Sequence, residues 1–218
     1  MLHVARFRVS LFLALVVAVG VLMLRRVQGD ASKMSGIIPE EAQRWVDDLG
    51  LAPQKYGNWL KESYTSDIVI SDLPPRFAGG SRKLSDDIYN LYARHSDNAS
   101  LVAGFPLHML MSDEMWIYHA GDGPLTLFLF DLENKSLRNV TVGNTPGALP
   151  QFVVKHETWI GMLLERGTTW ALTGAQNTPA FDPRDSFMAG DNATIVARLY
   201  ATFPEQRHLI DTLLSFPS

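Results

Sequence analysis

The spacing of apolar residues along the chain changes from helical to strand-like and then back to helical. Near the start, Pro39 and two glutamates precede four apolar residues that recur at helical spacing. This pattern predicts an amphipathic helix over residues 39–51. A turn and a strand are expected over residues 51–64, and the prolines and glycines of residues 65–83 predict a long surface loop.

The middle of the chain is built from short segments separated by turn residues, and none of it has a sustained helical period. Strands of this length and spacing predict an all-β fold, either a sandwich or a barrel. The residues after 193 return to helical spacing, with Pro204 between two helical pieces. We expect strands at residues 88–94, 100–111, 114–120, 125–132, 137–143, 151–155, 158–165 and 168–175.

The N-terminus has the pattern of a secretory leader. Arg6 and Arg8 precede an apolar run over residues 11–24, which falls short of the roughly 20 residues of a spanning helix. We expect a signal peptide or signal anchor, and hence a secreted or lumenal protein. The alternative is a protein anchored in the membrane by the uncleaved apolar run, the one membrane contact that we expect.

Four of the eight asparagines begin an Asn-x-Ser/Thr acceptor without proline at x, which is more than chance spacing supplies. Such acceptors are used on surface loops of proteins in the secretory pathway. They therefore predict a glycoprotein and agree with the leader. The acceptor residues are Asn98, Asn134, Asn139 and Asn192.

Composition narrows the fold and the partners. The 218 residues, 46% of them hydrophobic, are enough for one buried domain, so we divide the chain into a leader (1–29), a linker (30–38) and a domain (39–218). A net charge of −4 without a basic run beyond the leader argues against nucleic acid. The absence of cysteine excludes disulfides, thiolate zinc sites and thiol catalysis.

Candidate chemistry is concentrated in residues 104–121, where two strands meet at a turn. Side chains alternate between the faces of a strand, so His108 shares a face with Leu110, and Glu114 shares one with Trp116 and Tyr118. Burying an unpaired carboxylate in a plain core is costly. The set therefore favours a pocket over simple core packing.

The spacing of His108, Glu114 and Gly121 resembles the first motif of the cupin superfamily, in which a second histidine stands where this chain has Leu110. Further blocks resemble the branch known as the cupin 5 domain of unknown function. The resemblance implies a jelly-roll barrel, the cupin double-stranded β-helix, with an N-terminal helix and C-terminal helices, usually a homodimer with a ligand-sized cavity in the barrel mouth. The blocks are Ser-Asp-Glu-x-Trp (112–116), Ala-Gly-Asp (120–122), Thr-Trp (158–159) and Pro-x-Phe-Asp (179–182).

The chain departs from this family at positions that matter for metal binding. Metal-binding cupins hold their ion with three histidines and a glutamate, of which this chain keeps His108 and Glu114. Ile160 stands where the resemblance places the histidine of the second motif, and His119 faces away from Glu114. His156 in a turn is a further candidate ligand. We therefore favour no cofactor, with a divalent metal at His108 and Glu114 as the alternative.

These residues support three hypotheses about function. The first is binding of a small organic ligand, such as a sugar derivative, by His108, Glu114, Trp116, Tyr118 and Trp159, with Phe128 or Phe130 as a further wall. The second, which the resemblance suggests, is a metal-independent sugar isomerase or epimerase with His108 as base and Tyr118 as acid. The third is a metal-dependent cupin enzyme. Alternatively, the aromatic residues simply fill the barrel.

Overall fold

The computed structural model describes residues 37–77, 79–96 and 102–216, which lie in the compact unit Ile37–Ser218. The expected leader, most of the expected linker and the acceptor Asn98 lie outside the described residues. Within these ranges, no helix has both the length and the hydropathy needed to cross a bilayer.

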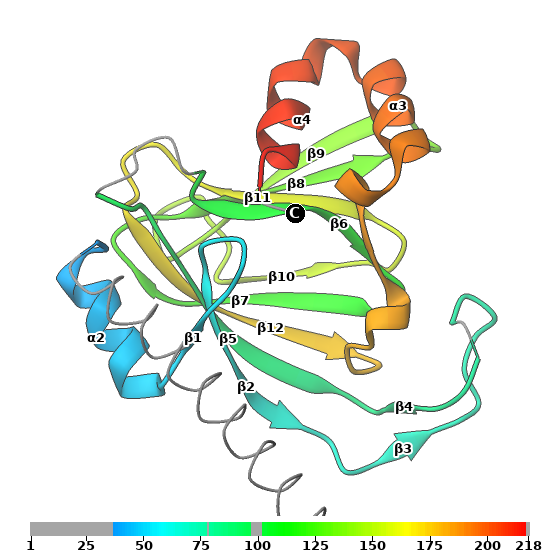
Figure 1. Ribbon diagram of the computed structural model, residues 1–218, viewed down its shortest axis with the longest axis horizontal. Helices are drawn as coiled ribbons and strands as arrows, with labels where there is room; N and C mark the ends of the chain where they lie inside the picture. Colours follow the sequence, from blue (N-terminus) through cyan, green and yellow to red (C-terminus); the bar gives the residue numbers. More distant parts are fainter. Residues whose placement is uncertain (1–36, 78, 97–101, 217–218) are drawn as a thin grey trace, which may run out of the picture. The chain divides into compact units, whose positions relative to one another are not determined.

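Two antiparallel sheets face each other and form most of the unit (Figure 1). This arrangement confirms the predicted all-β fold with helices at both ends. In the six-stranded sheet the order is β1 (Ala52–Pro53), β2 (Trp59–Thr65), β5 (Asp86–Ala93), β12 (Trp170–Thr178), β7 (Asp113–Gly121) and β10 (Gln151–Val154). In the five-stranded sheet the order is β13 (Ser186–Met188), β6 (Gly104–Leu110), β11 (Trp159–Leu164), β8 (Leu125–Asp131) and β9 (Ser136–Val142).

An apolar core fills the space between the two sheets on the side of β7 and β8. It combines Trp116 and Val154 of one sheet with Leu127, Ile160 and Met162 of the other, all nearly inaccessible to solvent. Alternation along each strand sends every second side chain into this core. Strands β2 and β13 are less buried than the strands of this core: four residues of β2 and Phe187 of β13 are exposed.

Helices pack against the sheets from outside. The predicted first helix is α2 (Glu40–Leu49), which ends where Gly50 takes a left-handed conformation with φ of 64°, and it packs against β5 and β12. The helices α3 (Ala193–Thr202) and α4 (Arg207–Leu214) cover the five-stranded sheet, with Pro204 in the short turn η3 (Pro204–Gln206) between them.

The structure differs from the predicted elements in two places that bear on the site. Residues 65–83 are mostly loop but contain a ribbon of two short strands, β3 (Val69–Ile70) and β4 (Arg82–Lys83). Strand β12 continues to Thr178, past the predicted end at residue 175, because its last residues pair with both β5 and β7. Pairing on two sides outweighs the turn preference of its polar residues.

Candidate functional site

Four polar side chains form one row across the inner face of the six-stranded sheet. Thr65 is the register partner of Asp86, Asp86 of Asn177, and Asn177 of Glu114. Directly opposite residues on paired strands point to the same face with their Cβ atoms about 5 Å apart. We call these four residues the polar row; the last three are buried.

Three oxygen atoms of the polar row are buried without a hydrogen-bond partner among the described residues: Thr65 Oγ1, Asp86 Oδ1 and Asn177 Oδ1. The second oxygen of Asp86 accepts from the Phe181 N–H at 2.9 Å. An unsatisfied buried polar group costs about 1–3 kcal/mol, so folded proteins keep few of them. The row therefore presents more acceptors than the surrounding chain satisfies.

Burial favours the neutral form of both carboxyl groups in the row. Burial raises the pKa of Glu114, and the nearby Asp86 adds to the rise, while His108 and the Trp116 N–H at 2.7 Å oppose it. Burial also raises the pKa of Asp86, against the hydrogen bond from Phe181 and the nearby side-chain and backbone N–H groups of Asn177. A protonated carboxyl donates as well as accepts, so each group is able to exchange a proton or a hydrogen bond.

His108 reaches the same interior from the five-stranded sheet, where its register partners are Ile160 and Met188. Its Nδ1 lies 2.9 Å from the carbonyl oxygen of Pro106. A carbonyl only accepts, so Nδ1 carries the hydrogen and Nε2 holds the lone pair when the ring is neutral. The edge-on ring of Phe105 at 5.0 Å fixes the imidazole further.

Trp116 and Tyr118 face the interior as predicted, but each is held there by a contact with another residue of the fold. The Trp116 ring stacks on Tyr92 with centroids 6.3 Å apart. The Tyr118 hydroxyl donates to the Gly123 carbonyl at 2.9 Å, and burial raises the pKa of Tyr118 to about 12. Tyr118 lies four residues, or roughly 13 Å, along β7 from Glu114. The hydroxyl is thus tied to a turn at the other end of the strand rather than directed toward His108.

The structure contradicts the predicted place of Trp159 in the cavity. Trp159 and Phe130 are register partners on the outer face of the five-stranded sheet, where Leu213 of α4 packs beside them. Phe128 shares that outer face. The physical reason is alternation: Ile160, the next residue, is the register partner of His108 and points inward.

The sequence reasoning missed Asp86 and Asn177, which stand at the centre of the polar row. It also missed a chain of hydrogen bonds on the same face, in which Asn58 donates to Asn90 and Asn90 to the Tyr92 hydroxyl, each at 2.7 Å. The signal was present in β5, where Asp86, Asn90 and Tyr92 recur at even spacing. Asn177 gave no such signal because the sequence around it is typical of a turn.

A pocket of about 360 Å³ opens next to the polar row, and Thr65 and Asp86 line it. Glu62 and Phe181 also line it. Arg82 also lines it, but the guanidinium is held by two hydrogen bonds to the buried Asp185, at 2.6 and 2.9 Å. The pocket therefore connects the outside of the barrel with the end of the row.

The described residues do not fit a cupin metal centre. No three His, Cys, Asp or Glu side chains in residues 37–77, 79–96 and 102–216 converge on one point. Leu110 and Ile160 occupy the positions where histidines would complete the ligand set around His108 and Glu114. His156 donates to Asp113 from Nδ1 at 2.8 Å and also from its backbone N–H. Burial raises the pKa of Asp113, but the hydrogen bonds from Lys155 and His156 outweigh burial and lower this pKa to about 2.

Comparison with known proteins agrees with this architecture. A protein from Shewanella oneidensis is 24% identical with a TM-score of 0.61, covering 81% of this chain and 98% of its own. A hypothetical protein from Leishmania major is 26% identical with a TM-score of 0.60, covering 78% and 96%. No curated protein matches this sequence.

The model of one protein family matches residues 43–189, about two thirds of the chain, and that family is described as Cupin superfamily (DUF985). The match includes the two facing sheets and the motif around Glu114. The chain therefore belongs to the cupin superfamily, in the DUF985 family.

Proposed function

We propose that this cupin-fold protein binds a small hydroxylated organic molecule between the polar row and His108. The observation that carries the proposal is the set of three buried, unpartnered oxygens on Thr65, Asp86 and Asn177. Hydroxyl groups are suited to this surface because each donates to an acceptor and also accepts. A bound ligand would thereby remove the cost of the unsatisfied oxygens.

The polar and apolar groups around the polar row indicate which class of ligand fits there. The unpartnered oxygens of the row are suited to the hydroxyl groups of an uncharged ligand, and burial, which raises the pKa values of Asp86 and Glu114, opposes the accumulation of charge there. The rings of Trp116 and Tyr92 supply an apolar surface on the same face. Binding sites for small molecules commonly join such apolar walls to a few fixed polar groups. Sugars and related polyols combine both properties.

The test is equilibrium dialysis of the protein against a mixture of monosaccharides, polyols and nucleosides, with mass spectrometry of what the protein enriches. We expect the wild type to enrich one class and Asn177→Leu to lose it, because leucine has a similar volume but no amide. Gln176→Leu is the matched control, since residue 176 faces away from the row. Equal retention by wild type and Asn177→Leu, or enrichment of nothing, would contradict the proposal.

Acid–base catalysis is a second candidate, and the fixed tautomer of His108 favours it. The free Nε2 is suited to accept a proton, and Glu114, with its raised pKa, is suited to return one. We infer that Glu114 fits the acid role better than Tyr118, whose hydroxyl is tied to Gly123. Deuterium exchange from D₂O into keto sugars tests this: His108→Gln should abolish exchange and Tyr118→Phe should keep it.

We also propose that the protein acts as a glycosylated homodimer in the secretory pathway. Three acceptor asparagines, Asn134, Asn139 and Asn192, are exposed in the described part of the chain. Asn192 uses its Oδ1 to cap α3, accepting from the N–H groups of Thr194 and Ile195, which leaves Nδ2 for a glycan. A divalent metal held by His108 and Glu114 alone, without the further histidines of a cupin metal centre, is the alternative to a purely organic ligand. Native mass spectrometry separates the two, because a bound metal ion and a bound organic molecule differ in mass.

A further inference from the structure

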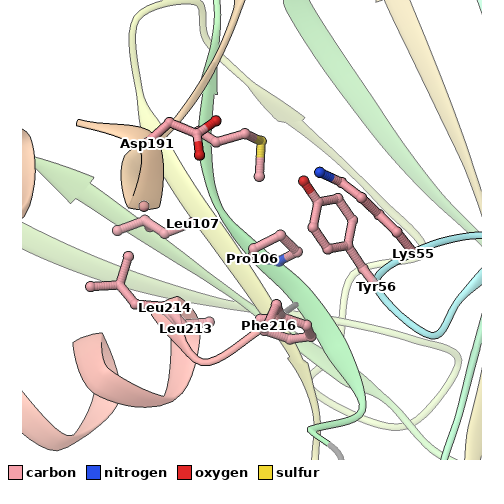
Figure 2. A pocket seen from close by; sticks show the side chains of 10 residues that line it. Lys55, Tyr56, Pro106, Leu107, Asp191, Leu213, Leu214 and Phe216 are labelled. Carbon is pink, nitrogen blue, oxygen red and sulfur yellow. The ribbon is translucent and has the colours of Figure 1, made fainter. Parts of the chain in front are cut away.

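A second pocket lies outside the polar row, at the free edge of β6 (Figure 2). Strand β13 pairs with β6 only over residues 108–110, so Pro106 and Leu107 extend beyond their neighbour on this side. Proline suits such an edge because it has no N–H to leave unpaired. The pocket at this edge has a volume of about 130 Å³.

The floor of this pocket is apolar and comes from elements far apart in the sequence. Pro106 and Leu107 of β6 meet Leu213 and Leu214 of α4 and the following Phe216 (Figure 2). Leu107 and Leu213 are fully buried and belong to the core beneath the floor, so Leu214 and Phe216, which are partly exposed, supply its accessible apolar surface. A volume well below the roughly 300 Å³ of a typical ligand pocket restricts the occupant to a small molecule.

Opposite charges stand on the two sides of this floor. Lys55 comes from the turn between β1 and β2, and Asp191 from the short helix η2 (Ala189–Asp191) (Figure 2). Neither forms an ion pair within the part of the chain that the structure describes. The Lys55 ammonium lies 4.7 Å from the centre of the Tyr56 ring, and that ring packs edge-on against Phe105 and Phe216. The cation is thus placed beside the pocket by aromatic contacts.

We propose that this pocket binds a free α-amino acid with an apolar side chain. Its carboxylate pairs with Lys55, its ammonium pairs with Asp191, and its side chain covers the apolar floor. An amino acid presents two opposite charges beside one apolar group, which is the arrangement that the pocket complements. The site is distinct from the polar row, shares none of its residues, and does not depend on the ligand proposed for the barrel.

Ligand-detected NMR with L-leucine at millimolar concentration tests the proposal on the full chain. Surface charge pairs contribute little individually, so we expect weak binding that falls about fivefold or less when either charge is removed. The variants are Lys55→Met and Asp191→Asn. Arg166→Met and Asp72→Asn, at exposed positions elsewhere, are the matched controls and should bind as the wild type does.

Two leucine analogues assign each charge to its partner. The wild type should bind L-leucine better than 3-methylbutylamine, which lacks the carboxylate, or 4-methylpentanoate, which lacks the ammonium. In Lys55→Met the preference for L-leucine over 3-methylbutylamine should disappear. In Asp191→Asn the preference for L-leucine over 4-methylpentanoate should disappear. No binding of L-leucine to the wild type, or unchanged preferences in both variants, would overturn the proposal.

The same titration separates this site from the barrel. Asn177→Leu should bind L-leucine as the wild type does, even though it loses the hydroxylated ligand. Loss of L-leucine binding in folded Asn177→Leu, with Lys55→Met unaffected, would show that the amino acid enters the barrel and would overturn the assignment to this pocket. Failure of the barrel proposal alone would leave the L-leucine results as expected.

Discussion

Glu114 is a carboxyl group buried between the sheets, where an ordinary core would have an apolar side chain. Its carboxyl is 7% exposed, and the Trp116 N–H satisfies only one of its two oxygens among the hydrogen bonds of the described residues. Asp86, in the same row, has one oxygen without any such partner. Residues that are costly to the fold are commonly kept because function needs them.

Replacing Glu114 by glutamine is expected to stabilise the fold at neutral pH by about 0.5–2 kcal/mol. Burial raises the pKa of Glu114 above 4.5, so the folded protein holds this proton more tightly than the unfolded chain does. The free energy of unfolding of the wild type therefore falls as the pH rises from the unfolded pKa through the raised folded pKa. Glutamine cannot ionise, and its amide oxygen still accepts from Trp116.

Urea unfolding of wild type and Glu114→Gln at several pH values measures this difference. The two proteins should be alike below the unfolded pKa, and the variant should be the more stable above the folded pKa. Glu133→Gln, in an exposed turn, is the control and should show no such trend. A variant that is less stable than the wild type at neutral pH would show that the ionised carboxylate supports the fold.

Alternation along the strand predicted the faces of the β7 side chains correctly. Glu114, Trp116 and Tyr118 share the inner face of β7, and His119 points outward, as expected. The hydrogen-bond partners were not predictable, because they depend on which strands become neighbours. The Tyr118 hydroxyl, for example, donates to the Gly123 carbonyl across a turn whose conformation is not predictable from the sequence.

The register between neighbouring strands determines which side chains lie next to each other. The polar row exists because β2, β5, β12 and β7 are neighbours and are aligned at four particular residues. A shift of one residue in any of these pairs would turn that strand's side chain to the other face. The strands themselves were predictable from apolar spacing and turns, and the predicted segments agree with β5 to β11 within a few residues. Trp159 was misplaced because the inward-facing Ile160 next to it puts Trp159 on the outer face, and Asn177 was missed because the sequence around it is typical of a turn. The alignment of Asn177 with Asp86 and Glu114 depends on register, which the apolar pattern alone does not specify.

A buried ion pair between Arg82 and Asp185 helps to anchor the ribbon of β3 and β4 to the barrel. Arg82 and Asp185 are each 3% exposed, and the guanidinium binds both carboxylate oxygens. We expect Arg82→Met to lower the free energy of unfolding by about 3–5 kcal/mol, because it leaves Asp185 buried without its partner. The double variant Arg82→Met, Asp185→Leu should recover most of that loss, since it removes both charges.

A double-mutant cycle by urea unfolding measures this coupling. Arg184→Met is the control, because Arg184 pairs with Asp182 at the exposed surface and its loss should cost little. Equal destabilisation by Arg82→Met and Arg184→Met would show that burial of the Arg82–Asp185 pair is not what makes it matter. A double variant no more stable than Arg82→Met alone would show that the unpaired Asp185 is not the cause of the loss.

Large apolar side chains are exposed to solvent on and beside the ribbon of β3 and β4. Ile68 and Val69 are 55% and 59% exposed, and Phe181, which lines the same pocket as Val69, is 50% exposed. Two-stranded ribbons are marginally stable in water on their own. A second copy of the chain that packs on this surface would cover these residues and hold the ribbon, which is why we place the proposed dimer contact here.

Val69→Lys is expected to convert a dimer into a monomer, because it places a charge in the centre of that contact. Light scattering on a sizing column measures the mass directly. Val153→Lys, at an exposed position on the edge strand β10, is the control and should stay dimeric. A wild type with the mass of one chain, or dissociation by Val153→Lys alone, would contradict the proposed contact.

Native mass spectrometry shows whether the polar row and His108 enclose a ligand. The protein would be purified from a secretory host without chelators and measured before and after glycan removal, beside the double variant His108→Gln, Asn177→Leu. We expect the deglycosylated wild type to retain a small organic mass that the folded variant lacks. A retained mass of a single metal ion, or wild type and variant equally empty and equally folded, would contradict the claim.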